Sequence, residues 1–99
     1  MEDIKAKKFR DMMYNQSGNG VRAAAFHTLT RASKKPEALA AGIALILVVV
    51  CKKYRVKPQE VLEMAARIYN EGESLLAGDE RQFHLAVANY VANELPDVT

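Results

Sequence analysis

Several residue types that direct particular folds or functions are scarce in this sequence. It contains no tryptophan, one cysteine, three prolines and five glycines among 99 residues. The lone cysteine, Cys51, excludes a disulfide bond within the chain and is typical of a reducing compartment. The segment Met1–Tyr14 mixes charged with apolar residues, so it lacks the continuous apolar stretch of a secretory signal. We therefore expect a cytoplasmic protein.

The residue groupings that carry catalysis or bind metals are also missing. The two histidines, His27 and His84, are distant in sequence, and no Cys-x-x-Cys, His-x-x-x-His or clustered carboxylate–histidine pair occurs. Catalysis needs several groups that converge on one point, and the sequence offers no such convergence. It therefore predicts no enzyme activity, no metal site and no cofactor.

The residues that are present are typical of a small globular domain. Apolar residues make up 49% of the chain and charged residues 26%, which excludes a disordered tail. A chain of this length forms one domain, so we assign residues 1–99 to a single unit. Apolar residues recur at helical spacing, and alternating strand patterns are nearly absent. We expect an all-α fold, a compact bundle of four to five helices around a central apolar helix at about residues 36–54.

Breaks between the predicted helices are marked by proline, glycine and polar clusters. Residues 15–20 (NQSGNG) form the clearest loop, and Pro36 and Pro58 each suit the first turn of a helix, where a missing N–H costs nothing. Gly72 weakens the fourth helix by about 1 kcal/mol relative to alanine, which leaves open whether that helix ends there. The predicted helices cover residues 3–14, about 21–32, 36–54, 58 to near 72, and 79 onward.

The run ALAAGIALILVVVC, residues 38–51, has no charge, hydroxyl or amide in its side chains. As a helix it would span about 21 Å, which is short of the roughly 30 Å hydrocarbon core of a membrane, so we expect no membrane span. A helix that is apolar on every side has to be covered on every side, by other helices of the chain or by a second copy. Small residues let a neighbouring backbone approach, and we predict a helix-packing groove or homodimer contact at Ala40, Ala41, Gly42 and Ala44.

The net charge of +2 hides an uneven distribution. Residues 1–57 hold twelve Lys or Arg against four Asp or Glu, and residues 58–99 hold two against eight. Either the two halves face each other, within one chain or between two, or a half meets a partner of opposite charge. Candidate contacts with an anion or nucleic acid are Arg22, Arg31, Lys34, Lys35, Lys52, Lys53 and Arg55, and the candidate acidic face for a protein partner consists of Glu60, Glu63, Glu71 and Glu73.

Residues 51–67 (CKKYRVKPQEVLEMAAR) resemble a helix-turn-helix motif, which implies a second helix that reads DNA. Two features depart from the pattern. Arg55 stands where glycine usually makes the turn, and Glu60 and Glu63 on the second helix would oppose the DNA phosphates. The residues at matching positions are Cys51, Val56, Pro58 and Val61.

The stretch GNGVRA, residues 18–23, has the spacing of a dinucleotide-binding fingerprint, but a predicted helix precedes it where a strand is required. We interpret it as a loop followed by the start of a helix. The free N–H groups of that start, with Arg22 in the first turn, are suited to a phosphate or carboxylate.

Together these features predict a small non-enzymatic helical binding protein. We expect it to self-associate as a homodimer and to act as an adaptor, regulator or inhibitor by contact with a larger protein partner. The alternative is a small nucleic-acid-binding regulator that uses the basic N-terminal half and a degenerate helix-turn-helix at residues 51–67.

Overall fold

The structure, a computed structural model, describes residues 3–75 and 78–97. Within those ranges the regular structure is entirely helical, which confirms the all-α prediction. The helices, in chain order, are α1 (Ile4–Tyr14), α2 (Gly18–Arg31), α3 (Pro36–Tyr54), α4 (Pro58–Glu73) and α5 (Asp79–Glu94).

The helix starts follow from local side-chain chemistry. Asp3 caps α1, because its carboxylate accepts hydrogen bonds from the amides of Lys5 at 2.8 Å and Ala6 at 3.3 Å. Prolines occupy the first position of both α3 and α4, as predicted for Pro36 and Pro58.

The start of α2 differs from the prediction, and the end of α4 settles a point that the prediction left open. The hydroxyl of Ser17 accepts a hydrogen bond from the amide of Gly20 at 2.9 Å, and this cap lets α2 begin at Gly18, inside the predicted loop. The loop prediction is therefore wrong for residues 18–20. The helix α4 continues through Gly72 and ends at Glu73, so this glycine does not break the helix. The absent Cβ of Gly72 makes room for a neighbouring helix, as described below.

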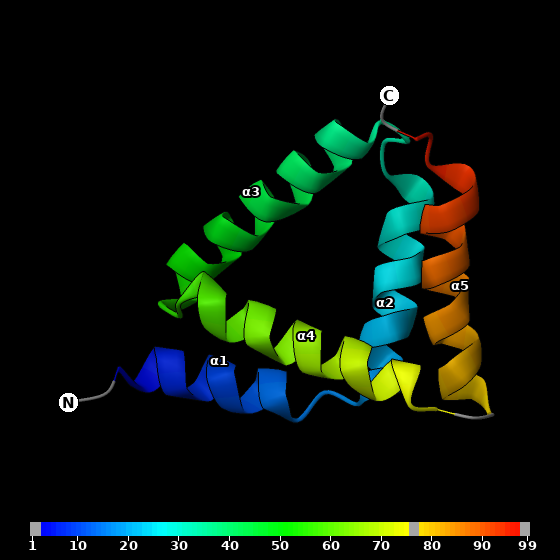
Figure 1. The fold of residues 1–99 in the computed structure, drawn as a ribbon. Coiled ribbons are helices and arrows are strands. Elements are labelled where there is room, and N and C mark those ends of the chain that lie inside the picture. The colour runs from blue at the N-terminus through cyan, green and yellow to red at the C-terminus, as the bar shows by residue number, and fades with distance from the viewer. Residues whose placement is uncertain (1–2, 76–77, 98–99) are drawn as a thin grey trace.

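The helices enclose an open triangle (Figure 1). The first side is the pair α2 and α5, which pack side by side. The second side is α3, which leaves the far end of this pair and meets the start of α4. The third side is α4, which returns to the near end of α2 and α5, and α1 lies along its outer edge.

The best-covered part of the molecule is the corner where α1, α3 and α4 meet. Ala6, Cys51 and Val56 are buried together there, with Phe9 and Leu47 packed against them. Polar contacts around this corner hold α1 in place. Arg10 Nε lies 2.7 Å from Glu60 Oε2, and Arg55 Nη1 lies 2.6 Å from Asp3 Oδ2.

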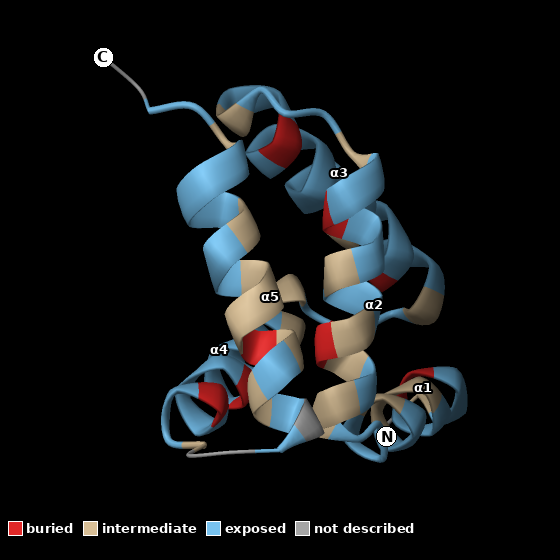
Figure 2. Cartoon of the chain, turned by 90° about the vertical axis from the view of Figure 1, so that its right-hand side faces the viewer, coloured by how far each residue is buried: buried red, intermediate tan, exposed pale blue. Residues whose placement is uncertain are grey.

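The middle of α3 is not covered within the single chain, although the sequence predicted a central position for this helix. Of its residues, Leu39 and Cys51 are buried, whereas Leu45, Ile46 and Val49 are each 60–64% exposed. Figure 2 shows the contrast between buried and exposed segments. The other helices contact α3 near its two ends, and within the described part of the chain no further helix lies across its middle.

The surface area and the radius of gyration also indicate that the single chain is incompletely covered. The chain exposes 7347 Å², whereas a folded monomer of 11.0 kDa is expected to expose about 5,600 Å². Its radius of gyration is 14.8 Å, against about 13 Å for a compact domain of this length. The single chain is therefore more open than a self-sufficient domain, by about 1,700 Å² of surface.

Candidate protein-binding surfaces

An apolar groove lies between α2, α3, α4 and α5. It has a volume of about 880 Å³, and Thr28 is the one side chain with a hydroxyl among the described residues that line it. The wall formed by α2 and α5 is made of aliphatic side chains that repeat at helical spacing. The described lining residues are Val21, Ala24, Ala25, Thr28 and Leu29 of α2, Pro36, Leu39, Ala40, Ile43 and Leu47 of α3, Val61 of α4, and Val87, Val91 and Leu95, the last just after α5.

A second apolar surface lies on the side of α3 that its own chain leaves open. The residues at positions 38, 42, 45 and 49 follow a helical spacing of four and three, so they share one face. All four are exposed, and a Cβ added at Gly42 would meet no atom within 4 Å. We call this face, Ala38, Gly42, Leu45 and Val49, the α3 stripe.

The small residues predicted to form a packing groove are divided between these two surfaces. Ala40 lines the apolar groove, and Gly42 belongs to the α3 stripe. Ala41 and Ala44 are exposed as well. Among the described residues, no atom lies within 4 Å of where a Cβ of Gly42 would stand, so the predicted packing role stays a prediction for an assembly.

The predicted acidic residues do not form one free face, because the fold uses several of them internally. Glu60 is half-buried against Arg10, and Glu71 lies 3.9 Å from the guanidinium of Arg67 on the same helix. Glu63 is exposed. The fourth residue, Glu73, contacts a different helix.

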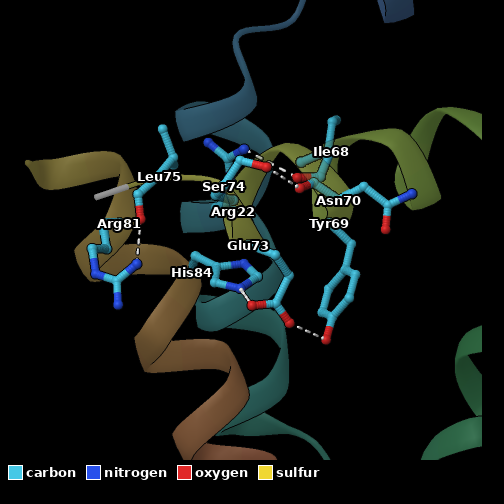
Figure 3. Close-up of polar contacts among 9 residues, drawn as sticks. All are labelled: Arg22, Ile68, Tyr69, Asn70, Glu73, Ser74, Leu75, Arg81 and His84. Atoms are coloured by element: carbon cyan, nitrogen blue, oxygen red, sulfur yellow. Dashed lines mark hydrogen bonds and ion pairs between the residues drawn. The ribbon is translucent and has the colours of Figure 1, made fainter. Parts of the chain in front are cut away.

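Glu73 connects α4 to α5 (Figure 3). Its Oε1 accepts a hydrogen bond from the Tyr69 hydroxyl at 2.6 Å, and its Oε2 lies 3.4 Å from Nε2 of the buried His84. The hydrogen bond from Tyr69, followed by that from His84, lowers the pKa of Glu73, and the same carboxylate raises the pKa of Tyr69. His84 packs so closely on Gly72 that a Cβ there would overlap its ring. This cluster therefore has a clear structural role, because it joins the two helices.

The predicted basic contacts are divided in the same way. Arg22 is only 6% exposed and donates a hydrogen bond to the carbonyl of Ile68 at 3.1 Å, so its side chain joins α2 to α4 rather than facing solvent (Figure 3). Arg55 is paired with Asp3, and the hydrogen bond from Arg55 lowers the pKa of that carboxyl. The other predicted basic residues, Arg31, Lys34, Lys35, Lys52 and Lys53, are exposed.

Lys5 and Lys8, two lysines of the basic N-terminal half, lie beside an aromatic stack. The rings of Phe9 and Tyr54 are parallel within 8°, with centroids 4.4 Å apart, and Lys53 Nζ lies 5.5 Å from the Tyr54 centroid. Lys5 and Lys8 border a pocket of about 390 Å³ at the same place. No sequence signal could have paired Phe9 with Tyr54, because 45 residues separate them.

The segment that resembles a helix-turn-helix does form two helices joined by a short turn. Arg55 takes the left-handed conformation, with φ 61° and ψ 37°, at the position where the motif usually has glycine. Cys51 and Val56 are buried, as the motif requires of its apolar positions. Burial, followed by the charge of Glu60, raises the pKa of the Cys51 thiol, which keeps it protonated and unreactive.

A metal-binding cluster or a membrane-spanning helix would each indicate a function of another kind. Within residues 3–75 and 78–97, no three side chains of His, Cys, Asp or Glu gather in a way that could hold a metal ion. None of the helices in this described part of the chain combines the length and the apolar character needed to cross a membrane.

The comparisons with known proteins leave the geometry as the sole guide to function. No protein-family model matches this chain, and neither a curated protein nor a solved structure matches it.

Proposed function

We propose that this chain is a non-enzymatic helical binding module that works as a homodimer and holds a helix of a larger protein in its apolar groove. One observation carries the proposal: the chain exposes about 1,700 Å² more than a monomer of its mass should. Much of its most exposed apolar surface lies on α3. Large apolar surfaces of this kind mark sites of association.

The size of the excess supports two contacts rather than one. A stable interface of standard size removes about 800 Å² from each partner. The excess is about twice that value, so a dimer contact through α3 leaves surface for a second contact. The apolar groove is the remaining surface of the right kind.

The shape of the groove favours a helical segment as its occupant. A helix with side chains is about 10 Å wide and rises 1.5 Å per residue, so a volume near 880 Å³ fits about two of its turns. Helix-in-groove recognition uses such an apolar face. Lys35 is exposed directly before the groove residue Pro36, and Arg31 is exposed one turn after the groove residue Thr28. We therefore expect the bound helix to be amphipathic, with acidic residues near this end.

The first test is size-exclusion chromatography with light scattering at low and high salt, with absorbance recorded at 260 and 280 nm. A dimer that persists at high salt without 260 nm absorbance supports the proposal, because an apolar interface is insensitive to screening. The chain has no tryptophan, so bound nucleic acid would dominate the 260 nm signal. A monomer at micromolar concentration would contradict self-association.

The second test addresses the groove. Thr28→Asp places a carboxylate among its aliphatic side chains, and Ala24→Asp does so from the neighbouring turn of α2. Both positions are exposed in the single chain, so the fold should survive. We expect both variants to remain dimers and to lose a partner that the unmodified chain retains; retention of that partner by both variants would contradict the groove as its site.

A nucleic-acid-binding function is the second candidate, and the Phe9–Tyr54 stack favours it. Lys5, Lys8 and Lys53 surround these rings, and cationic side chains beside aromatic rings are typical of sites that bind single strands. Alanine at the three lysines should then flatten the salt dependence of binding to a labelled oligonucleotide. A slope that does not change would count against this function.

A further inference from the structure

The α3 stripe continues to a charged residue in the same spacing. The steps from Ala38 to Gly42, Leu45, Val49 and Lys52 are four, three, four and three residues. This is the repeat that lets two helices pack along their full length as a coiled coil. The whole stripe is exposed, and the structure leaves open space at its glycine.

The size of the side chains changes abruptly halfway along α3. Residues 38–44 are alanine or glycine at five of seven positions, whereas residues 45–50 are all leucine, isoleucine or valine. Two parallel copies of such a helix would set small against small and large against large, which leaves voids at one end and crowding at the other. Two antiparallel copies set each small half against a large half.

We propose that two chains pair through antiparallel α3 helices, with the twofold axis between Leu45 and Ile46. In this register Gly42 of one copy faces Val49 of the other, so the missing Cβ makes room for the branched side chain. This inference rests on the proposed homodimer and specifies its interface.

The charges at the ends of α3 fit the same register. In this register Glu37, in the first turn of one helix, lies one residue away from the position opposite Lys53, in the last turn of the other. The antiparallel arrangement also places the positive N-terminal end of each helix dipole beside the negative C-terminal end of its partner. A parallel pair would bring Lys52 and Lys53 of both copies together at one end.

The occupant of the stripe is assigned to a second copy because the surface is complementary to itself. Apolar character, side-chain size and end charges all match when the helix is turned by half a rotation, which is the requirement for a closed twofold interface. The surface excess of about 1,700 Å² is also ample for the roughly 800 Å² that a stable dimer removes from each chain.

Cysteine cross-linking tests the register directly. Gly42→Cys and Val49→Cys are made as separate chains with different affinity tags, coexpressed and oxidised. We expect a disulfide between the two chains in the mixture and none when either variant is expressed alone. The pair Ala38→Cys and Lys53→Cys repeats the test without filling the space at Gly42. Cys51 stays in place, because it is 1% exposed and should not react.

The controls separate this inference from the proposed function. The unmodified chain and Asn89→Cys, which is exposed on α5, should form no cross-link. Cross-links within the single-variant samples would indicate a parallel pair and overturn the register. A dimer by light scattering that yields no cross-link with either pair would overturn the α3 interface and leave the homodimer standing. A monomer by light scattering would overturn both.

Discussion

The C-terminal end and the middle of one uninterrupted run of apolar residues in α3 have opposite surroundings. Cys51, near the C-terminal end, is enclosed by α1, α4 and the turn that contains Val56. Leu45, less than two turns away, is 64% exposed. Their intrinsic hydrophobicity does not explain the difference. The position of the neighbouring helices does, so the C-terminal end of α3 belongs to the core of the chain, and the middle of α3 is available for an assembly.

The largest effect should come from a charge placed in the covered corner. Cys51→Lys buries an ammonium group without a partner, which costs several kcal/mol in a domain of marginal stability. We expect loss of cooperative unfolding. Circular dichroism at 222 nm during heating measures this loss. A variant that unfolds at the temperature of the unmodified chain would contradict the assignment of this corner as the core.

The matched substitution in the exposed middle should act on assembly alone. Leu45→Lys adds the same charge to the same helix, at a position that is 64% exposed in the single chain. We expect retained helical content and a dimer dissociation constant raised about 30-fold or more, as for a central interface residue worth about 2 kcal/mol. Sedimentation equilibrium measures this constant. If Leu45→Lys instead unfolds the chain, the contrast between the two regions fails.

A third substitution tests the contact between α4 and α5, where the fold depends on a missing side chain. Gly72→Ala favours the helix by about 1 kcal/mol but places a Cβ against the His84 ring. Overpacking costs about 1–3 kcal/mol, so we expect a lower midpoint in urea denaturation. Gly42→Ala is the matched control, because its Cβ meets no atom within 4 Å in the single chain. Both alanine variants are compared in the Leu45→Lys background, which we expect to be monomeric. A lower urea midpoint for Gly42→Ala in that background would contradict the role of the Cβ contact at Gly72.

The smallest effect concerns pH. The pKa of Asp3 is lowered by hydrogen bonds from Arg55 and from backbone amides, so its stabilising contribution is full above the unfolded-state pKa, near 4, and is lost as the pH falls through the folded-state pKa. We expect α1 to loosen below about pH 4. Near-ultraviolet circular dichroism of the Phe9–Tyr54 stack measures this change. Arg55→Ala should move this transition to higher pH; an unchanged midpoint would contradict the link.

Much of the fold could be predicted from local sequence signals, and the open arrangement of α3 could not. Pro36 and Pro58 mark the starts of their helices because the ring fixes the backbone geometry of a first turn. The start of α2 was missed because glycine at positions 18 and 20 suggested a loop, whereas the Ser17 cap outweighs it. The exposure of Leu45 depends on where distant helices lie, and periodicity holds no such information.

The candidate sites show the same division. The apolar run and its small residues pointed to α3, and α3 contributes to both candidate surfaces. Charge counting was less informative, because it could not show that Arg22 would be buried against the carbonyl of Ile68 or that Glu60 would pair with Arg10. Charged residues report on a binding face only once their partners inside the chain are known.

Because each chain leaves apolar surface uncovered, the lifetime of the chain should depend on its concentration. If dimerisation covers the middle of α3, mass action makes the melting temperature rise with protein concentration, and dilution below the dissociation constant returns the chain to an open form. In a cell, a less stable chain is unfolded for a larger fraction of the time, and the unfolded form is the one that proteases cleave. The amount of the chain would then be held above a threshold set by its own interface, since copies made in small numbers would be degraded before they could pair.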